Sequence, residues 1–313
     1  VGITKLKNSD KENGFAPIII MQATHSGRYS KPTGVPAPII AYNNPIFEGD
    51  NPIDKSRIIT DDKLFELEEQ YGKAAKLAEE AGFDGVDIKC CHRYLDSELL
   101  SAFERDGRYG GSLENRCRIV ELIIKGIKEK TNLPVWIKLS AEDNRKGGMN
   151  INSSVEICKR LEKSGCDAIE VSCGTVQDGM NTMRSELMPM NAVFKYREPC
   201  ASFPKILNKI ALPAANLINP LIKQPKPLEN FNVDNAAIIK KNVSVPVIVV
   251  GGIHKVSDME DILTDGKADF VSMCRPFICE PDLAKKLKNG QSEAKCIMCN
   301  YCGLVIEKEP TRC

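Results

Sequence analysis

The chain has 313 residues, of which 42% are hydrophobic and 27% are charged, and its formal net charge is +1. This composition is typical of a globular protein with one large core or two modest ones. The near-neutral charge excludes the basic surface that binding to nucleic acid or to an anionic membrane requires. No apolar run is long enough to cross a bilayer and no signal peptide follows Val1, so we expect a cytoplasmic chain with an incomplete N-terminus.

Strands and helices are predicted to alternate along the chain. A continuous apolar run closed by a polar residue predicts a buried strand at residues 16–22. Further strands are predicted at residues 85–89, 134–139, 168–172, 245–250 and 268–273. Amphipathic spacing predicts helices at residues 61–81, 112–130, 153–164, 233–241, 256–264 and 281–287. Residues 174–232 show weak periodicity and read as a long insertion.

Such alternation indicates a parallel sheet. No G-x-G-x-x-G follows a strand, which argues against a doubly wound nucleotide-binding sheet. The pattern predicts an α/β fold, a (β/α)8 TIM barrel that lacks its first two β/α units.

A polar cluster lies where the strand at residues 85–89 ends. It consists of Lys89, His92, Arg93, Tyr94 and Asp96. Active sites of α/β barrels lie at the C-terminal ends of the strands, so this cluster is the first candidate for catalysis. The alternative for this stretch alone is an ordinary solvated loop.

The last two predicted strands are followed by residues suited to phosphate. Gly251 and Gly252 follow one strand, and Cys274 and Arg275 follow the next. Glycines allow backbone N–H groups to approach an anion, and arginine can bind phosphate through two hydrogen bonds. We therefore predict a phosphate site there, with a tight turn and a surface arginine as the alternative.

Two further strand ends carry Gln22 and Lys138. If a flavin lies across the barrel mouth, Gln22 can bond its pyrimidine edge, and Lys138 can place positive charge near N1 and the C2 carbonyl. Together with the phosphate loops, these residues outline a bound mononucleotide.

Six segments are similar to the Old Yellow Enzyme family of FMN-dependent NAD(P)H oxidoreductases, in the branch with 2,4-dienoyl-CoA reductase-like proteins. They are QATHSGR (22–28), residues 78–103, RYGGSLENR (108–116), WIKLSAED (136–143), VVGGI (249–253) and CRPFICEPDL (274–283). RYGGSLENR is the most diagnostic, and the opening part of the family, with its first two strands, is absent. Within QATHSGR, His25 and Arg28 are expected to shape the loop.

The resemblance implies that NAD(P)H reduces FMN, which then passes hydride to the β-carbon of an activated alkene in a small-molecule substrate. Tyr94 is implied as the proton donor, because a phenol with a pKa near 10 keeps its proton at neutral pH. His92 and Lys89 are implied to bind the substrate carbonyl, although Lys89 stands where relatives carry His or Asn. Arg93 replaces a common glycine and is expected to contact an acidic group of the substrate. Self-association is left open.

The C-terminal tail carries closely spaced cysteines. Cys296, Cys299 and Cys302 form C-x2-C-x2-C, and Cys313 follows. This spacing favours a [4Fe–4S] cluster, with zinc or no metal as alternatives. We expect residues 1–290 to form a partial FMN-binding barrel and residues 291–313 a cysteine-rich tail. Two rival functions remain, a non-catalytic barrel without FMN and an iron–sulfur flavoenzyme that acts on amines or acyl-CoA thioesters.

Overall fold

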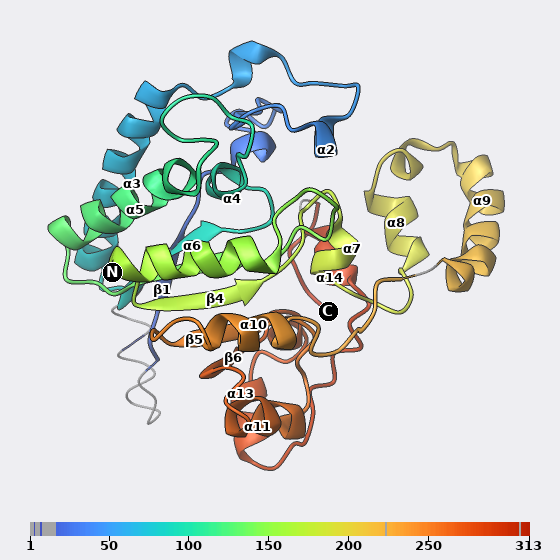
Figure 1. The fold of residues 1–313 in the computed structure, drawn as a ribbon. Helices are drawn as coiled ribbons and strands as arrows, with labels where there is room; N and C mark the ends of the chain where they lie inside the picture. The colour runs from blue at the N-terminus through green and yellow to red at the C-terminus, as the bar shows by residue number, and fades with distance from the viewer. Residues whose placement is uncertain (1–2, 4–6, 8–16, 223, 307) are drawn as a thin grey trace. The chain divides into compact units, whose positions relative to one another are not determined.

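The computed structural model describes residues 3, 7, 17–222, 224–306 and 308–313 (Figure 1). Two compact units make up the chain. Unit 1 comprises Val1–Val176 and Asn235–Ile248, and unit 2 comprises Gln177–Asp234 and Val249–Cys313.

Unit 1 is built on parallel strands that follow one another across the sheet in chain order. These strands are β1 (Ile20–Ala23), β2 (Gly85–Cys90), β3 (Val135–Ser140) and β4 (Ala168–Ser172). Lys89 lies opposite Lys138, and Lys138 lies opposite Glu170. Because side chains at paired positions point to the same face of a sheet, these three charged side chains share one face.

The helices of unit 1 cover the sheet and connect its strands. They are α2 (Pro45–Glu48), α3 (Asp61–Ala81), α4 (Leu95–Leu100), α5 (Leu113–Lys130), α6 (Ile151–Lys163) and most of α10 (Val233–Lys240). Helices α3, α5 and α6 pack side by side (Figure 1). Helix α3 begins at Thr60, whose side chain accepts a hydrogen bond from the Lys63 amide, and ends at Gly82, which has a φ of 91°.

Strand β5 (Val247–Val250) begins in unit 1 and ends in unit 2. The other elements of unit 2 are α7 (Gly179–Thr182), α8 (Met190–Tyr196), α9 (Lys205–Ile218), α11 (Val256–Thr264), β6 (Phe270–Ser272), α12 (Arg275–Cys279), α13 (Leu283–Lys288) and α14 (Tyr301–Val305). Helix α14 of the tail packs on α8, where Ala192, Tyr196 and Val305 form a buried cluster.

The predicted α/β class is confirmed, and each predicted strand is present, with the predicted bounds at β4 and shifted ends elsewhere. The first predicted strand begins at Ala16, which lies outside the described residues, and the structure shows β1 from Ile20. The region predicted as an aperiodic insertion contains α7, α8 and α9. Helix α9 has no buried residue and contains Pro213, a residue that usually interrupts a helix, so the sequence did not indicate this element. No described helix is both long and apolar enough to span a membrane.

Candidate functional site

The first group of predicted site residues lies at the C-terminal ends of neighbouring strands in unit 1. Lys89 is near the end of β2, and Tyr94 caps the start of α4. The ammonium nitrogen Nζ of Lys89 lies 3.3 Å from the centroid of the Tyr94 ring. The Tyr94 ring also packs against Tyr29, with 5.2 Å between the ring centroids. Burial lowers the pKa of Lys89, because a low-dielectric environment disfavours the charged amine.

His92 follows β2 directly and is fixed through both its backbone and its ring. Its backbone N–H donates to Ser140 Oγ at 3.0 Å, and its ring nitrogen Nε2 lies 2.8 Å from Ser172 Oγ. Burial, with smaller contributions from Lys89 and Lys138, lowers the pKa of His92 to about 3. The imidazole is therefore neutral at physiological pH, with one donor nitrogen and one acceptor nitrogen.

A buried polar group lies beside this cluster, across β1 to β4. Gln22 Nε2 donates to Asp87 Oδ2 at 2.5 Å, and Lys138 Nζ donates to Glu170 Oε1 at 2.9 Å. Burial raises the pKa of Asp87 to about 6. Its second oxygen, Oδ1, is buried and has no hydrogen-bond partner among the described residues.

Sequence reasoning missed Asp87. The available signal was an acidic residue inside the strand GVDIK, which was otherwise read as buried. A buried carboxylic acid requires a partner or a raised pKa, so its position alone could have marked it.

This set of polar atoms fits the pyrimidine edge of a flavin. Because its amide nitrogen donates to Asp87, Gln22 keeps an amide oxygen that can accept a hydrogen bond. Lys138 supplies a cation, and the unpartnered Asp87 Oδ1 offers a further acceptor. A flavin ring presents one N–H donor between two carbonyl acceptors, which matches acceptors and a cation placed together.

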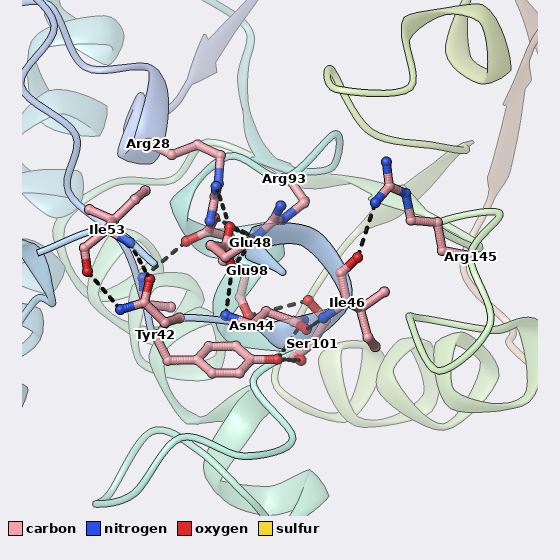
Figure 2. A network of polar contacts seen from close by, with 12 residues as sticks. Arg28, Tyr42, Asn44, Ile46, Glu48, Ile53, Arg93, Glu98, Ser101 and Arg145 are labelled. Carbon is pink, nitrogen blue, oxygen red and sulfur yellow. Dashed lines mark hydrogen bonds and ion pairs between the residues drawn. The ribbon is translucent and has the colours of Figure 1, made fainter. Parts of the chain in front are cut away.

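Arg93 does not have the position that the sequence predicted. Its side chain is 3% exposed, its Nη2 donates to Glu48 Oε1 at 3.0 Å, and its guanidinium carbon lies 3.7 Å from the centroid of the Phe47 ring. Figure 2 shows Arg93 with Arg28, Glu48 and Glu98 in one polar network. Arg93 thus binds the chain's own acidic residues, and the expected contact with an acidic substrate group is not what the structure shows.

The predicted phosphate residues lie in unit 2, and packing within the chain accounts for their glycines. Gly251 has a φ of 143° and Gly252 a φ of 72°. A Cβ on Gly252 would lie 2.3 Å from the carbonyl oxygen of Leu228, and one on Gly251 would lie 2.7 Å from Phe231 Cε2. Close approach of the chain at residues 228–231 therefore requires both glycines, and their contact with phosphate stays a prediction.

Arg275 is the first residue of α12 and follows the exposed Cys274. Its Nη1 donates to the carbonyl oxygens of Arg184 at 2.9 Å and Met298 at 3.2 Å, and to Asn300 Oδ1 at 2.6 Å. Arg275 thus links the turn after β6 to the C-terminal tail within unit 2.

The tail cysteines are free thiols. Cys296, Cys299 and Cys302 are half-buried, whereas Cys313 is exposed. Burial raises the pKa of Cys296 and of Cys302. Within the described ranges, no three Cys, His, Asp or Glu side chains are arranged to hold a metal ion. These thiols, as placed here, do not fit an iron–sulfur cluster, and the cluster stays a prediction.

The predicted residues thus form two groups. Unit 1 brings together Gln22, Lys89, His92, Tyr94 and Lys138, and unit 2 contains Gly251, Gly252, Cys274, Arg275 and the tail cysteines.

The NADH:flavin oxidoreductase / NADH oxidase family matches the chain at residues 11–221 and 205–294, so the match extends over most of the chain. The chain belongs to this family. Membership confirms the resemblance to Old Yellow Enzyme that the sequence segments indicated.

This chain covers only part of the length of the individual proteins to which it is similar. It is 30% identical over 314 residues to an NADH oxidase from Thermoanaerobacter brockii, covering 96% of this chain and 42% of that protein. The solved structure of a 2-naphthoyl-CoA reductase complex matches with a TM-score of 0.72 at 21% identity, over 96% of this chain and 43% of that one. An old yellow enzyme homologue from Zymomonas mobilis matches with a TM-score of 0.61 at 21% identity, over 93% and 72%. The chain thus spans less than half of the first two relatives, and the two structures share its fold.

Proposed function

We propose that the chain carries an FMN-dependent oxidoreductase site that reduces an activated alkene, such as an enone, enoate or enoyl thioester, at the expense of NAD(P)H. Bound FMN would supply the redox chemistry by accepting hydride from NAD(P)H and delivering it to the β-carbon of the alkene. The observation that carries the proposal is the gathering of Lys89, His92 and Tyr94 at the end of β2, beside Gln22 and Lys138.

Tyr94 would donate the proton that completes the reduction. As hydride reaches the β-carbon, the phenolic O–H breaks and its proton goes to the α-carbon, leaving a phenolate that solvent reprotonates. The ammonium group of Lys89, 3.3 Å from the ring centroid, stabilises negative charge on that ring. Lys89 therefore eases loss of the Tyr94 proton.

His92 and Lys89 would bind the carbonyl oxygen that activates the alkene. Negative charge develops on this oxygen when hydride adds to the β-carbon, and fixed donors there lower the barrier. The contact with Ser172 holds the neutral His92 ring in one orientation. The positively charged Lys89 is the stronger of the two donors.

Gln22 and Lys138 would bind the pyrimidine edge of FMN, and Gly251, Gly252, Cys274 and Arg275 its phosphate. Gln22 and Lys138 are supported by the donors and acceptors described above. The phosphate residues are supported by their position after the last two strands, where barrels commonly bind phosphate.

The decisive experiment is purification of the chain followed by analysis of released flavin. We expect a yellow protein that releases FMN on denaturation and couples NAD(P)H oxidation to reduction of an enone. A colourless protein that binds no added FMN would instead favour the non-catalytic barrel.

The likeness to a 2-naphthoyl-CoA reductase over 96% of the chain favours an acyl-CoA thioester as the activated substrate. The spacing of the tail cysteines in the sequence, and not their placement in the structure, leaves an iron–sulfur version of this enzyme as the second candidate. Iron and sulfide in anaerobically purified protein would support it, and their absence would refute it. We propose that the protein works in the reducing cytoplasm, and its thirteen unpaired cysteines support this proposal.

A further inference from the structure

A short segment is tied to the site by buried ion pairs. We call residues 44–48, which comprise Asn44 and α2, the strap. Glu48 Oε1 of the strap accepts from Arg28 Nη1 at 2.7 Å and from Arg93 Nη2 at 3.0 Å (Figure 2). The three side chains are 5%, 7% and 3% exposed, respectively, so little water screens these pairs.

Glu98 of α4 completes the network. It pairs with Arg28, its Oε1 lies 3.5 Å from Arg93 Nη2, and its Oε2 accepts from the Ala41 amide at 3.0 Å. Two arginines and two glutamates thus balance their charges in the interior, as buried ionic groups must. Loss of any one member would leave an unpaired buried charge.

Two arginines contact the aromatic ring of the strap. The guanidinium carbons of Arg93 and Arg145 lie 3.7 Å and 4.8 Å from the centroid of the Phe47 ring. Arg145 also donates to the Ile46 carbonyl oxygen at 3.1 Å (Figure 2). Side chains that follow β1, β2 and β3 therefore all hold the strap, with Arg93 making both kinds of contact.

Arg93 occupies a backbone conformation that favours glycine. His92 and Arg93 have φ values of 62° and 59°, which are strained for residues with a Cβ. The turn that they form separates the end of β2 from Tyr94 at the start of α4. A glycine would adopt this turn without strain. The contacts of the Arg93 side chain therefore add to the backbone hydrogen bonds from His92 to Ser140 and from Arg93 to Ser97 in holding a conformation that arginine does not favour.

We propose that Arg93 is a positioning residue, whose ion pair with Glu48 and stacking on Phe47 fix the turn that presents His92 and Tyr94. The proposal rests on the proposed function for the roles of His92 and Tyr94. It assigns the strap the task of holding the proton donor and the carbonyl-binding residue in one geometry.

Amide hydrogen exchange tests whether Arg93 holds the strap, and this measurement does not require bound flavin. The amides of Phe47 and Glu48 donate to the Asn44 carbonyl oxygen, and that of Gly49 donates to Pro45. In the full chain, we expect the R93G substitution to speed exchange of these amides roughly tenfold, since the strap then loses a buried anchor. Substitution of Glu48 by Gln, which keeps shape and removes charge, should act in the same direction. Unchanged exchange in both variants would overturn the proposal.

Arg118→Ala is the matched control for exchange, because Arg118 also pairs with an acidic residue but lies on α5 and is partly exposed. It should leave the strap amides unchanged. Faster exchange of the strap amides in this control as well would indicate general loosening of unit 1 and would overturn a specific role for Arg93.

Separate measurement of the two half-reactions tests the consequence for chemistry. Arg93→Gly should slow alkene reduction roughly tenfold to a hundredfold, as expected for a small misplacement of catalytic groups. The rate of flavin reduction by NAD(P)H should change by less than about twofold, because the proposed positioning of His92 and Tyr94 does not serve that step. Arg93→Lys keeps the charge and should recover part of the rate. Equal losses in both half-reactions would mean a merely structural role. A wild-type chain that binds no FMN would refute the proposed function, and the exchange result would still decide whether Arg93 fixes the strap.

Discussion

The Lys89 ammonium lies over the face of the Tyr94 ring, with 3.3 Å between Nζ and the ring centroid. A cation there favours the phenolate over the phenol, so the pair is arranged for release of a proton. Burial lowers the pKa of Lys89, which means that its charge is held at a cost in free energy. Such a cost is typical of side chains placed for chemistry rather than for stability.

The proposed role of Tyr94 as proton donor predicts that Tyr94→Phe affects the two half-reactions unequally. Removal of one hydroxyl should slow alkene reduction about 100- to 10,000-fold, the usual contribution of a positioned general acid. Flavin reduction by NAD(P)H should remain nearly intact, because that step needs no proton from Tyr94. Rapid-mixing absorbance measurements follow the two half-reactions separately. Comparable losses in both would argue against Tyr94 as the donor.

Asp87 predicts a pH dependence of stability. Burial raises its pKa from the usual 3.8 to about 6, so the folded protein holds this proton more tightly than the unfolded chain. The contribution of Asp87 to the free energy of unfolding therefore falls as pH rises from about 4 to about 6. Asp87→Asn removes this loss. The stability of the variant relative to wild type should rise by up to about 3 kcal/mol between pH values of about 4 and 7.

Urea unfolding followed by fluorescence of Trp136, which is the single tryptophan in the sequence, measures this difference. The exposed Asp50→Asn serves as a control, since that carboxyl group lies in solvent. A pH-independent difference between Asp87→Asn and wild type would show that Asp87 is ionised alike in both states.

Gly252 and Gly290 both have a positive φ, but we expect them to differ greatly in how well they tolerate substitution by alanine. Gly252 and Gly290 have φ values of 72° and 97°, but a Cβ on Gly252 would meet the Leu228 carbonyl oxygen at 2.3 Å, whereas one on Gly290 meets nothing within 4 Å. Gly290→Ala should cost about 1 kcal/mol for its left-handed backbone. Gly252→Ala should cost about 1 to 3 kcal/mol more because of overpacking. Equal losses in thermal unfolding would disprove the close approach at Gly252.

Arg275 predicts a loss of flavin that can be separated from a loosened tail. Arg275→Ala should lower the ratio of bound FMN to protein, because the proposed charged donor to the FMN phosphate is removed. Arg197→Ala is the matched control, since Arg197 Nη2 also holds the tail, through the Gly303 carbonyl oxygen at 2.6 Å. If Arg197→Ala loses as much flavin as Arg275→Ala, the effect of Arg275 acts through the tail rather than on phosphate.

Strand β5 could be predicted because a strand buried on both faces is a continuous apolar run with clear ends. The gathering of the catalytic candidates could also be predicted, because Lys89 ends the predicted strand at residues 85–89 and His92 and Tyr94 follow within five residues. The role of Arg93 could not, because its partner Glu48 is 45 positions away along the chain. Nothing local in the sequence indicates a long-range pairing. Helix α9 was missed for a different reason, since it contains Pro213, and a proline in the interior of a segment argues against a helix.

The buried pairing of Arg93 with Glu48 also restricts how this sequence can diverge. Replacement of one of the two residues alone would leave the charge of the other unpaired in the interior, where solvent cannot compensate it. Drift at positions 48 and 93 should therefore be joint, with an acid retained at 48 wherever a base stands at 93. Aligned relatives would reveal this as covariation between two sites that the linear sequence gives no reason to connect.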